Sequence, residues 1–189
     1  MKKRVVDEKT ILDKFVEEFC SVVNRHCKYA VCSGFVAIAH GRARGTEDID
    51  MLIEKINFQE FLSLHNDLIK NDFVCIQSDS PKKLFYEYLK KGNSIRYVWK
   101  DEGFFPPEME LKFVKDELDE EQLKNRKKLP FSGLNVYFTS IESNIAFKED
   151  FLGSQKDLED AKHLRLIYKG KISEKEINKI KEKIKKYRK

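Results

Sequence analysis

Two aspartates one residue apart, Asp48 and Asp50, stand in the stretch GRARGTEDIDMLIE at the entrance to an apolar run. In a strand, such residues point to the same face, about 6.5 to 7 Å apart along the chain. Carboxylates held this close repel each other unless a cation lies between them, and hard oxygen ligands of this kind suit Mg²⁺ or Mn²⁺. The pair therefore predicts a metal site at the start of a strand.

Upstream of the aspartates, Ser33 and Gly34 form a predicted turn between a short buried strand and an apolar helix. At such a turn, backbone N–H groups and the positive end of the helix dipole can hold a phosphate. A phosphate-binding turn followed by a metal-binding strand supplies the two parts that position a nucleoside triphosphate for in-line attack at phosphorus. The order of these parts predicts a nucleotide-dependent transfer reaction.

These residues carry a resemblance. The stretch YAVCSGFVAIAHGRARGTEDIDMLI resembles the signature of the nucleotidyltransferase superfamily, the polymerase-beta-like fold, in which a Gly-Gly or Gly-Ser turn leads through a helix to an Asp-x-Asp strand. The run from Arg44 to Asp50 is similar to the R-x-T-x-D-x-D run of the AbiEii-type toxin nucleotidyltransferases. The later stretch SIESNIAFKEDFLGSQKDLEDAKHLRLI resembles the helical segment of that subgroup, with a Lys followed by a Lys/Arg-Asp-x-x-Asp element. At Phe35 the chain departs from the turn, so either Ser33 supplies the hydroxyl or triphosphate binding is weaker.

The resemblance implies that a third carboxylate, from a neighbouring strand, joins Asp48 and Asp50 as a metal ligand. Glu110 alternates with apolar residues in PPEMELKFVKDE, which places it on the polar face of a strand. We choose it over Glu108, which is close to the prolines, and over Asp116, which lies beyond the end of the strand. As a metal ligand or as a base, Glu110 would help to activate the attacking hydroxyl.

The resemblance also implies how the nucleotide is held. Lys148 would neutralise charge on the departing pyrophosphate, and Asp157 would orient Lys148 or the nucleotide. The residues that would contact the nucleotide itself are Ser33, Gly34, Arg44 and Lys156, with Asp160 beside them. Because nine residues of straight helix measure about 13.5 Å, Lys148 and Asp157 can meet only if the chain turns near Gly153.

The two arginines before the aspartates leave alternatives open. Arg42 and Arg44 could form structural ion pairs with Asp48 or Glu47, or they could contact a triphosphate as planar bidentate donors. An Asp-x-Asp pair alone is common on protein surfaces, and most lysines in a lysine-rich chain are solvated. The combination of the glycine turn, the helix, the two arginines and the later Lys-Asp element, rather than any single residue, favours a nucleotide-binding site over a structural explanation.

Hydrophobic periodicity predicts the elements that position these residues. Strands are expected over residues 29–32, 49–53, 73–76, 95–99, 108–114 and 134–140. Helices are expected over residues 7–26, 35–41, 57–71, 81–90, 141–152, 154–168 and after 170. Asn57 is the expected N-cap of the third helix. In the last helix, Ser173 and Glu176 form a candidate capping box, and the apolar stripe consists of Ile177, Ile180, Ile184 and Tyr187.

The predicted fold class is α/β (α+β): a nucleotidyltransferase-like mixed sheet flanked by helices, with C-terminal helices. Residues 1–140 would form the nucleotidyltransferase core. Residues 141–189 would form a helical segment that completes the active site and ends in a basic tail helix. Residues 169–189 contain ten Lys or Arg and three Glu, while the whole chain has a net charge of +5. Such a tail can recruit polyanions, although a lysine-rich helix is more often a solvated face.

Composition bounds the class of protein. The chain has 189 residues, of which 41% are hydrophobic and 37% charged, with no apolar run near 18 residues and no secretory signal pattern. We therefore expect a cytoplasmic protein with no membrane partner. The four cysteines and four histidines lack zinc-site spacing, so buried thiols and surface imidazoles are expected.

The expected function is a metal-dependent nucleotidyltransferase that moves a nucleoside monophosphate from an NTP to an acceptor hydroxyl and releases pyrophosphate. The cofactor would be Mg²⁺ or Mn²⁺. By the resemblance, the acceptor is an RNA 3′ end, such as that of tRNA, or a protein, and a small molecule such as an aminoglycoside is a further option. A cognate antitoxin is a possible partner. The alternatives are a non-catalytic nucleotide- or RNA-binding module on the same fold and a complex-forming, antitoxin-like protein.

Overall fold

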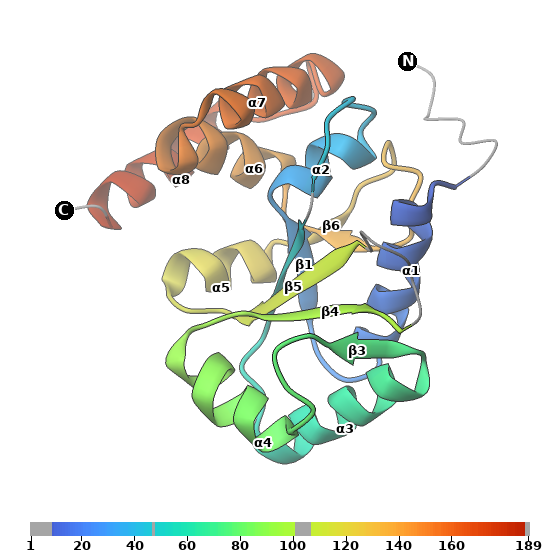
Figure 1. Ribbon diagram of the computed structural model, residues 1–189. Helices are drawn as coiled ribbons and strands as arrows, with labels where there is room; N and C mark the ends of the chain where they lie inside the picture. Colours follow the sequence, from blue (N-terminus) through green and yellow to red (C-terminus); the bar gives the residue numbers. More distant parts are fainter. Residues whose placement is uncertain (1–8, 47, 101–106, 188–189) are drawn as a thin grey trace.

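A computed structural model of the chain describes residues 9–46, 48–100 and 107–187 (Figure 1). Its described strands form one mixed sheet in the order β3-β4-β5-β2-β1-β7-β6. The strands are β1 (Tyr29–Cys32), β2 (Asp48–Ile53), β3 (Phe73–Cys75), β4 (Ile95–Trp99), β5 (Glu108–Phe113), β6 (Lys127–Lys128) and β7 (Tyr137–Phe138). The helices are α1 (Ile11–Val23), α2 (Gly34–Ala39), α3 (Phe58–Lys70), α4 (Pro81–Lys83), α5 (Glu117–Lys124), α6 (Ile141–Phe147), α7 (Gln155–Ile167) and α8 (Glu174–Tyr187). Two helical stretches continue as π-helical turns, Leu84–Tyr88 after α4 and Lys148–Leu152 after α6, and Leu89–Lys91 forms a 3₁₀ turn.

The register of the central strands sets up the site. β1 pairs antiparallel with β2, β2 parallel with β5, and β5 antiparallel with β4. Cys32, Asp50, Glu110 and Arg96 are therefore successive cross-strand partners. Because paired residues share a face, this row extends across four strands on one side of the sheet.

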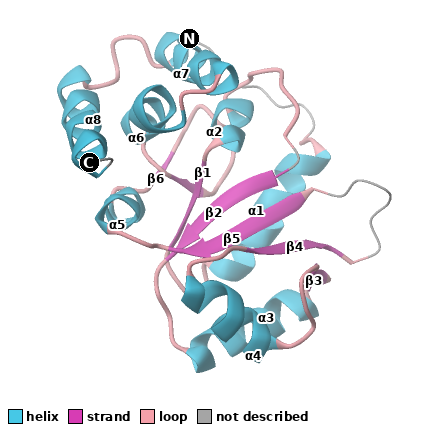
Figure 2. Cartoon of the chain, turned by 60° about the vertical axis from the view of Figure 1, so that its left-hand side comes forward, coloured by secondary structure: helices cyan, strands magenta, loops and turns pink. Residues whose placement is uncertain are grey.

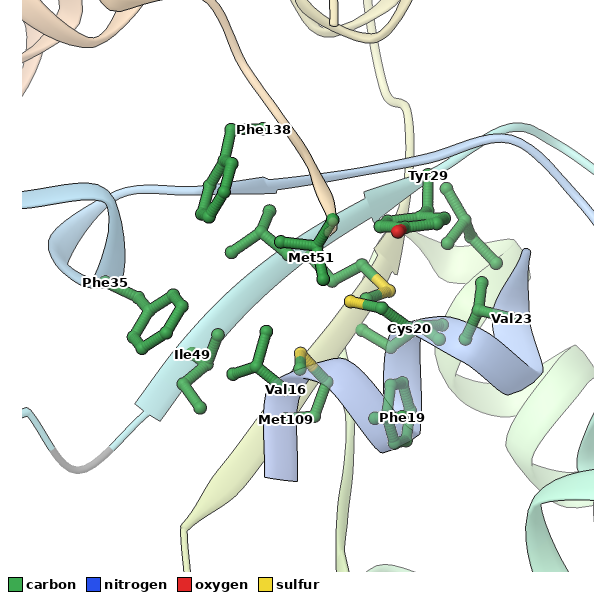
Figure 3. Packing of buried hydrophobic residues seen from close by; sticks show 14 of the residues in the cluster. Val16, Phe19, Cys20, Val23, Tyr29, Phe35, Ile49, Met51, Met109 and Phe138 are labelled. Atoms are coloured by element: carbon green, nitrogen blue, oxygen red, sulfur yellow. The ribbon is translucent and has the colours of Figure 1, made fainter. Parts of the chain in front are cut away.

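The other side of the sheet carries the main hydrophobic core. Ile49 and Met51 of β2 and Met109 of β5 pack against α1, which contributes Val16 and Phe19 (Figure 3). All five side chains are fully buried. Strand alternation therefore directs the residues between them, including both aspartates, to the opposite face.

The opposite, polar face is partly covered by helices. α5 packs there through Leu123, in a small cluster with Ala30, Cys32 and Leu52. In Figures 1 and 2, α6, α7 and α8 gather beside α2, away from α3 and α4 at the other end of the molecule. The helical segment thus lies next to the turn between β1 and α2.

Local capping explains where the first helices begin. Thr10 and Asp13 form a capping box at α1, and Asn57 and Glu60 form one at α3, which confirms the predicted Asn57 cap.

In α8 the three isoleucines of the predicted stripe are buried, whereas Tyr187 is 48% exposed. Its hydroxyl accepts a hydrogen bond from the Glu117 backbone N–H at 3.2 Å. The stripe prediction was therefore wrong for Tyr187.

Several predicted elements differ from the structure. The strand expected over 134–140 is reduced to β7, and α5 has no predicted counterpart. α5 begins because the Asp116 carboxylate caps the backbone N–H groups of residues 118 and 119. Its mixed composition gives only a weak amphipathic pattern, which is why periodicity does not reveal it.

Two of the histidines were wrongly expected at the surface. His40 and His65 are buried, and each forms a hydrogen bond of 2.8 Å to a tyrosine hydroxyl, from Tyr168 and Tyr97 respectively. The four cysteines are buried, free thiols, as predicted. Among the described residues, no helix is both long and apolar enough to cross a membrane.

Candidate active site

Asp48 and Asp50 lie on the polar face of β2, half-buried, and alternate with the buried Ile49 and Met51. Parallel pairing with β5 places Asp50 opposite Glu110 and Asp48 opposite Glu108. The register therefore brings the predicted third carboxylate to the same face as the aspartate pair. Glu108, the substitute considered from the sequence, lies in the strand as well.

The carboxylate of Glu110 is ion-paired to an arginine. Arg96 of β4 donates to Glu110 Oε2 from Nη2 at 2.9 Å and from Nε at 3.1 Å, and its Nε lies 3.7 Å from Glu108 Oε2. Within residues 9–46, 48–100 and 107–187, no three His, Cys, Asp or Glu side chains meet in a metal-binding group. Glu110 shares the face of the aspartates, but Arg96 is its partner in this structure.

Burial raises the pKa of the Asp50 carboxyl above its usual value, and the nearby carboxylates of Glu110 and Asp48 raise it further. Lys112 and a hydrogen bond from the Ser33 hydroxyl oppose this rise. Ionised Asp50 is thus desolvated and repelled by its neighbours, which is the condition under which a carboxylate gains most from a bound cation.

The turn between β1 and α2 is made by Ser33 and Gly34. Ser33 adopts φ 63° and ψ −135°, a conformation that favours glycine and is strained for serine. A Cβ on Gly34 would lie 3.1 Å from Arg44 Nη2, so glycine is needed for the arginine to lie against the backbone. Phe35 is fully buried and stacks on Phe138 with ring centroids 6.3 Å apart. Phe35 is therefore a core residue.

Asp160 of α7 joins three cations, and we call these residues the Asp160 cluster. Its carboxylate lies 2.7 Å from Lys148 Nζ and 2.6 Å from Arg44 Nη1, and it also pairs with Arg42. Asp160 is fully buried and the side chain of Lys148 is 1% exposed. Burial lowers the pKa of Lys148, whereas Asp157 opposes this. One buried carboxylate thus links the helical segment to the loop after α2 that carries Arg42 and Arg44, which we call the arginine loop.

The predicted turn near Gly153 is confirmed. Gly153 has φ 69° and ends the π-helical turn, and Ser154 caps α7 through the Asp157 N–H. Lys148 Nζ consequently lies 3.4 Å from Asp157 Oδ1. Lys156 is exposed, and its backbone carbonyl accepts a hydrogen bond of 2.9 Å from Arg42.

Of the alternatives left open for the two arginines, a structural ion pair with Asp48 is not formed. Arg42 pairs with Asp160 and with Glu159, and Arg44 pairs with Asp160 and donates to the Gly45 carbonyl. Glu47, the other acidic partner considered for the arginines, lies outside the described residues.

Two pockets meet at Ser33 and Asp50. The first, which we call the cationic cleft after Arg42, Arg44 and Lys156, has a volume of about 710 Å³ and also contains three carboxylates; it is lined by Ser33, Gly34, Arg42, Arg44, Gly45, Thr46, Asp48, Asp50, Lys156 and Glu159. The apolar pocket has a volume of about 360 Å³ and is lined by Cys32, Ser33, Asp50, Leu52, Lys112, Asp116, Leu118, Asp119, Gln122, Asn144, Phe147, Lys148, Phe151, Leu152 and Tyr187. The first is bounded by the arginine loop and the start of α7, and the second by α5, the π-helical turn and the end of α8.

Sequence reasoning gave no role to three site residues. Asp160 was noticed only as a neighbour of the Lys-Asp element, although a second Asp three residues after Asp157 shares its helix face. Lys112 lies two residues after Glu110 and therefore on the same strand face. Arg96 had no local signal, because only the β4–β5 pairing brings it to Glu110.

Comparisons with known proteins define the class of fold. No protein-family model matches the sequence, and no curated protein matches it. The antibiotic-resistance factor ANT(2'')-Ia in solution is similar with 12% identity and a TM-score of 0.55, over 93% of this chain and 92% of that chain. Its crystal structure in complex with adenylyl-2''-tobramycin gives 12% identity and a TM-score of 0.55, over 95% and 100%. An antigenic nucleotidyltransferase-like protein from Paracoccidioides brasiliensis gives 19% and 0.51, over 94% and 88%.

The similarity extends over nearly the whole chain, helical segment included. The mixed sheet with its flanking helices is thus a nucleotidyltransferase-like fold, which confirms the predicted fold class.

Proposed function

We propose that the protein is a Mg²⁺- or Mn²⁺-dependent nucleotidyltransferase that transfers a nucleoside monophosphate from an NTP to an acceptor hydroxyl. The observation that carries this proposal is the aspartate pair, Asp48 and Asp50, at the junction of the two pockets. The cationic cleft would take the triphosphate, and the α-phosphorus would lie beside the aspartates. The nucleotidyltransferase-like fold supports the same reaction class.

The chain's own residues would hold the leaving pyrophosphate. Arg42, Arg44 and Lys156 line the cationic cleft, where fixed positive charge stabilises charge that develops on the leaving group. Asp160 holds both guanidinium groups in place before the substrate arrives. The resemblance gives Lys148 a direct role on the pyrophosphate, but its ammonium is buried and paired with Asp160 and Asp157, and it does not line the cationic cleft, so we propose it as a positioning residue that Asp157 orients.

The donor set fits a hard divalent cation. Asp48 and Asp50 supply carboxylate oxygens, and Glu110 would join them once it leaves Arg96. A bound Mg²⁺ would neutralise phosphate charge and favour the deprotonated acceptor hydroxyl. Asp50 is desolvated and repelled by the carboxylates of Asp48 and Glu110, and a bound cation would offset both effects.

The helical segment, residues 141–189, would complete the site around a core formed by residues 1–140. We further propose that the protein belongs with the AbiEii-type enzymes and acts in the cytoplasm. Its acceptor would then be an RNA 3′ end, such as that of tRNA, or a protein, and an antitoxin would be a partner. Because ANT(2'')-Ia was crystallised in complex with adenylyl-2''-tobramycin, a hydroxyl of a small molecule is a further acceptor to be tested.

One observation favours a second candidate, a non-catalytic nucleotide-binding module. The third carboxylate, Glu110, is engaged in an ion pair with Arg96. In such a module the cationic cleft would bind an NTP without transferring it.

The test is transfer of label from each of the four α-labelled NTPs, with Mg²⁺ or Mn²⁺. The acceptors are total tRNA, cell protein and aminoglycosides. Asp48→Asn and Asp50→Asn should each reduce transfer at least on the order of a hundredfold. Because burial raises the pKa of Asp50, its ionised form costs folding energy, so Asp50→Asn should melt no lower than the wild type. Asp79→Asn, at an exposed position outside both pockets, is the matched control and should keep full activity.

Undiminished transfer by both site variants would refute the proposed metal site. NTP binding without transfer to any acceptor would establish the non-catalytic module instead.

A further inference from the structure

The apolar pocket contains polar groups that the proposed transfer reaction does not use. Gln122 of α5 is 8% exposed, and its side-chain amide forms no hydrogen bond with residues 9–46, 48–100 or 107–187. Among the described residues, only Arg126 Nε is a fully buried side-chain polar atom without a partner, so the amide of Gln122 reaches the open space of the pocket and can meet a ligand there. Removing only the polar atoms of Gln122 would therefore not weaken the fold.

A second polar group belongs to Asn144 of α6. Its Nδ2 donates to Thr139 O at 3.2 Å, to Thr139 Oγ1 at 2.7 Å and to Ser140 O at 2.9 Å. These three acceptors fix the orientation of the amide and leave Oδ1 without a hydrogen-bond partner in the described part of the chain. Asn144 thus offers the pocket an acceptor in a fixed position.

The walls of the pocket carry aromatic rings, of which Phe147 and Phe151 are inclined by 49° to each other, so a flat ring can stack on one face at a time. Phe147 and Phe151, whose ring centroids are 5.6 Å apart, and Tyr187 supply aromatic surface. Aromatic faces stack on nucleobases of any sequence, whereas amide and carboxylate groups distinguish their edges. The volume of about 360 Å³ lies within the range of small-molecule sites, about 300 to 1,000 Å³.

The position of the pocket completes the argument. It adjoins the cationic cleft at Ser33 and Asp50, so a nucleotide with its triphosphate in the cleft can extend its nucleoside into the pocket. Lys112 lines the apolar pocket, where its charge acts on Asp50, and its ammonium forms no ion pair with the described residues. It is therefore available to the ribose or to the α-phosphate.

We propose, on the basis of the proposed function, that the apolar pocket recognises the nucleobase of the NTP and that Gln122 and Asn144 read its edge. Asn144 Oδ1 and the Asp119 carboxylate are both acceptors, and they favour a base with an exocyclic amino group. The amino group of adenine, cytosine or guanine offers two N–H donors to these two acceptors, whereas the edge of uracil offers only N3–H. The pocket therefore selects against UTP.

The test measures equilibrium binding of ATP, CTP, GTP, UTP and inorganic tripolyphosphate to the full chain by calorimetry in Mg²⁺. The wild type should bind at least one amino-bearing NTP about tenfold more tightly than UTP. Gln122→Met keeps the volume and removes the hydrogen-bonding groups. The variant should bind that NTP about tenfold more weakly, bind tripolyphosphate with unchanged affinity and melt no lower than the wild type. Gln59→Met, at an exposed position on α3, is the control and should change none of these values.

The outcomes separate this inference from the proposed function. Equal affinity for all four NTPs, unchanged by Gln122→Met, would overturn nucleobase recognition while leaving a triphosphate site in place. A raised KM for the acceptor with unchanged NTP affinities would also overturn it, because the pocket would then hold the acceptor. Absence of both NTP and tripolyphosphate binding by the wild type would instead refute the nucleotide site itself.

Discussion

Replacing Asp160 by asparagine tests the arrangement on which the site depends. The side chain of Asp160 is fully buried and pairs with Lys148, Arg44 and Arg42. Removing one partner of a buried ion pair typically costs about 3 to 5 kcal/mol, because a charge is left desolvated without compensation. Asp157 remains 3.4 Å from Lys148 Nζ in the variant, so we expect the lower end, about 3 kcal/mol.

This free energy corresponds to a clear thermal shift. For a chain of this size, 1 kcal/mol lowers the melting temperature by about 2 to 4 °C, so Asp160→Asn should melt about 6 to 12 °C below the wild type. Urea unfolding should show the same loss with an unchanged slope. Glu159→Gln is the matched control, because Glu159 is 53% exposed and pairs with Arg42 at the surface. It should cost at most about 1 kcal/mol.

A double variant separates charge from packing. Adding Lys148→Met to Asp160→Asn removes the uncompensated ammonium, and it should recover part of the lost stability. If Asp160→Asn is no less stable than Glu159→Gln, or if Lys148→Met adds a further independent loss, the buried charge balance inferred from the structure is incorrect.

Two substitutions at the turn give further expected outcomes. Gly34→Ala introduces a Cβ 3.1 Å from the guanidinium of Arg44, which Asp160 holds in place, so stability should fall by about 1 to 2 kcal/mol and tripolyphosphate affinity should fall with it. Denaturant unfolding and calorimetry measure both, and an unchanged affinity would show that Arg44 does not contact phosphate. Ser33→Gly relieves the strained backbone and should stabilise the protein by about 1 kcal/mol while slowing transfer. A less stable Ser33→Gly protein would contradict the inferred strain.

Local pattern was sufficient for much of the fold and for the aspartate strand. Alternation in β2 and β5 has period two, so it correctly placed Asp48, Asp50 and Glu110 on polar faces. The turn at Gly153 followed from helix geometry, because Lys148 and Asp157 cannot meet along a straight helix. The sequence was therefore informative for features that depend on a single strand or helix, such as the face of a side chain or the position of a turn.

The remaining features depend on pairings between distant segments. Arg96 reaches Glu110 only through the β4–β5 register, and Asp160 meets Arg42 across more than 100 residues of chain. The buried His40 has a partner, Tyr168, that is equally remote. The periodicity of a single element does not encode such contacts. For this reason the only ion-pair partners considered for the arginines were the acidic residues closest to them in the sequence.

The distribution of charge in the site explains why both groups of residues are needed. The strands contribute carboxylates, Asp48 and Asp50, whereas the loop after α2 and the start of α7 contribute cations to the cationic cleft. In the Asp160 cluster, Asp160 pairs with all three cations, while Asp157 also pairs with Lys148 and Glu159 with Arg42. Three carboxylates therefore face three cations, and a phosphate would gain from guanidinium groups that buried pairing already holds in place rather than from an excess of charge. Ser33 and Asp50, which line both pockets, lie where the two charge regions meet, and a phosphate between them would face Arg42, Arg44 and Lys156 on one side and the aspartate strand, with the cation that we propose it binds, on the other.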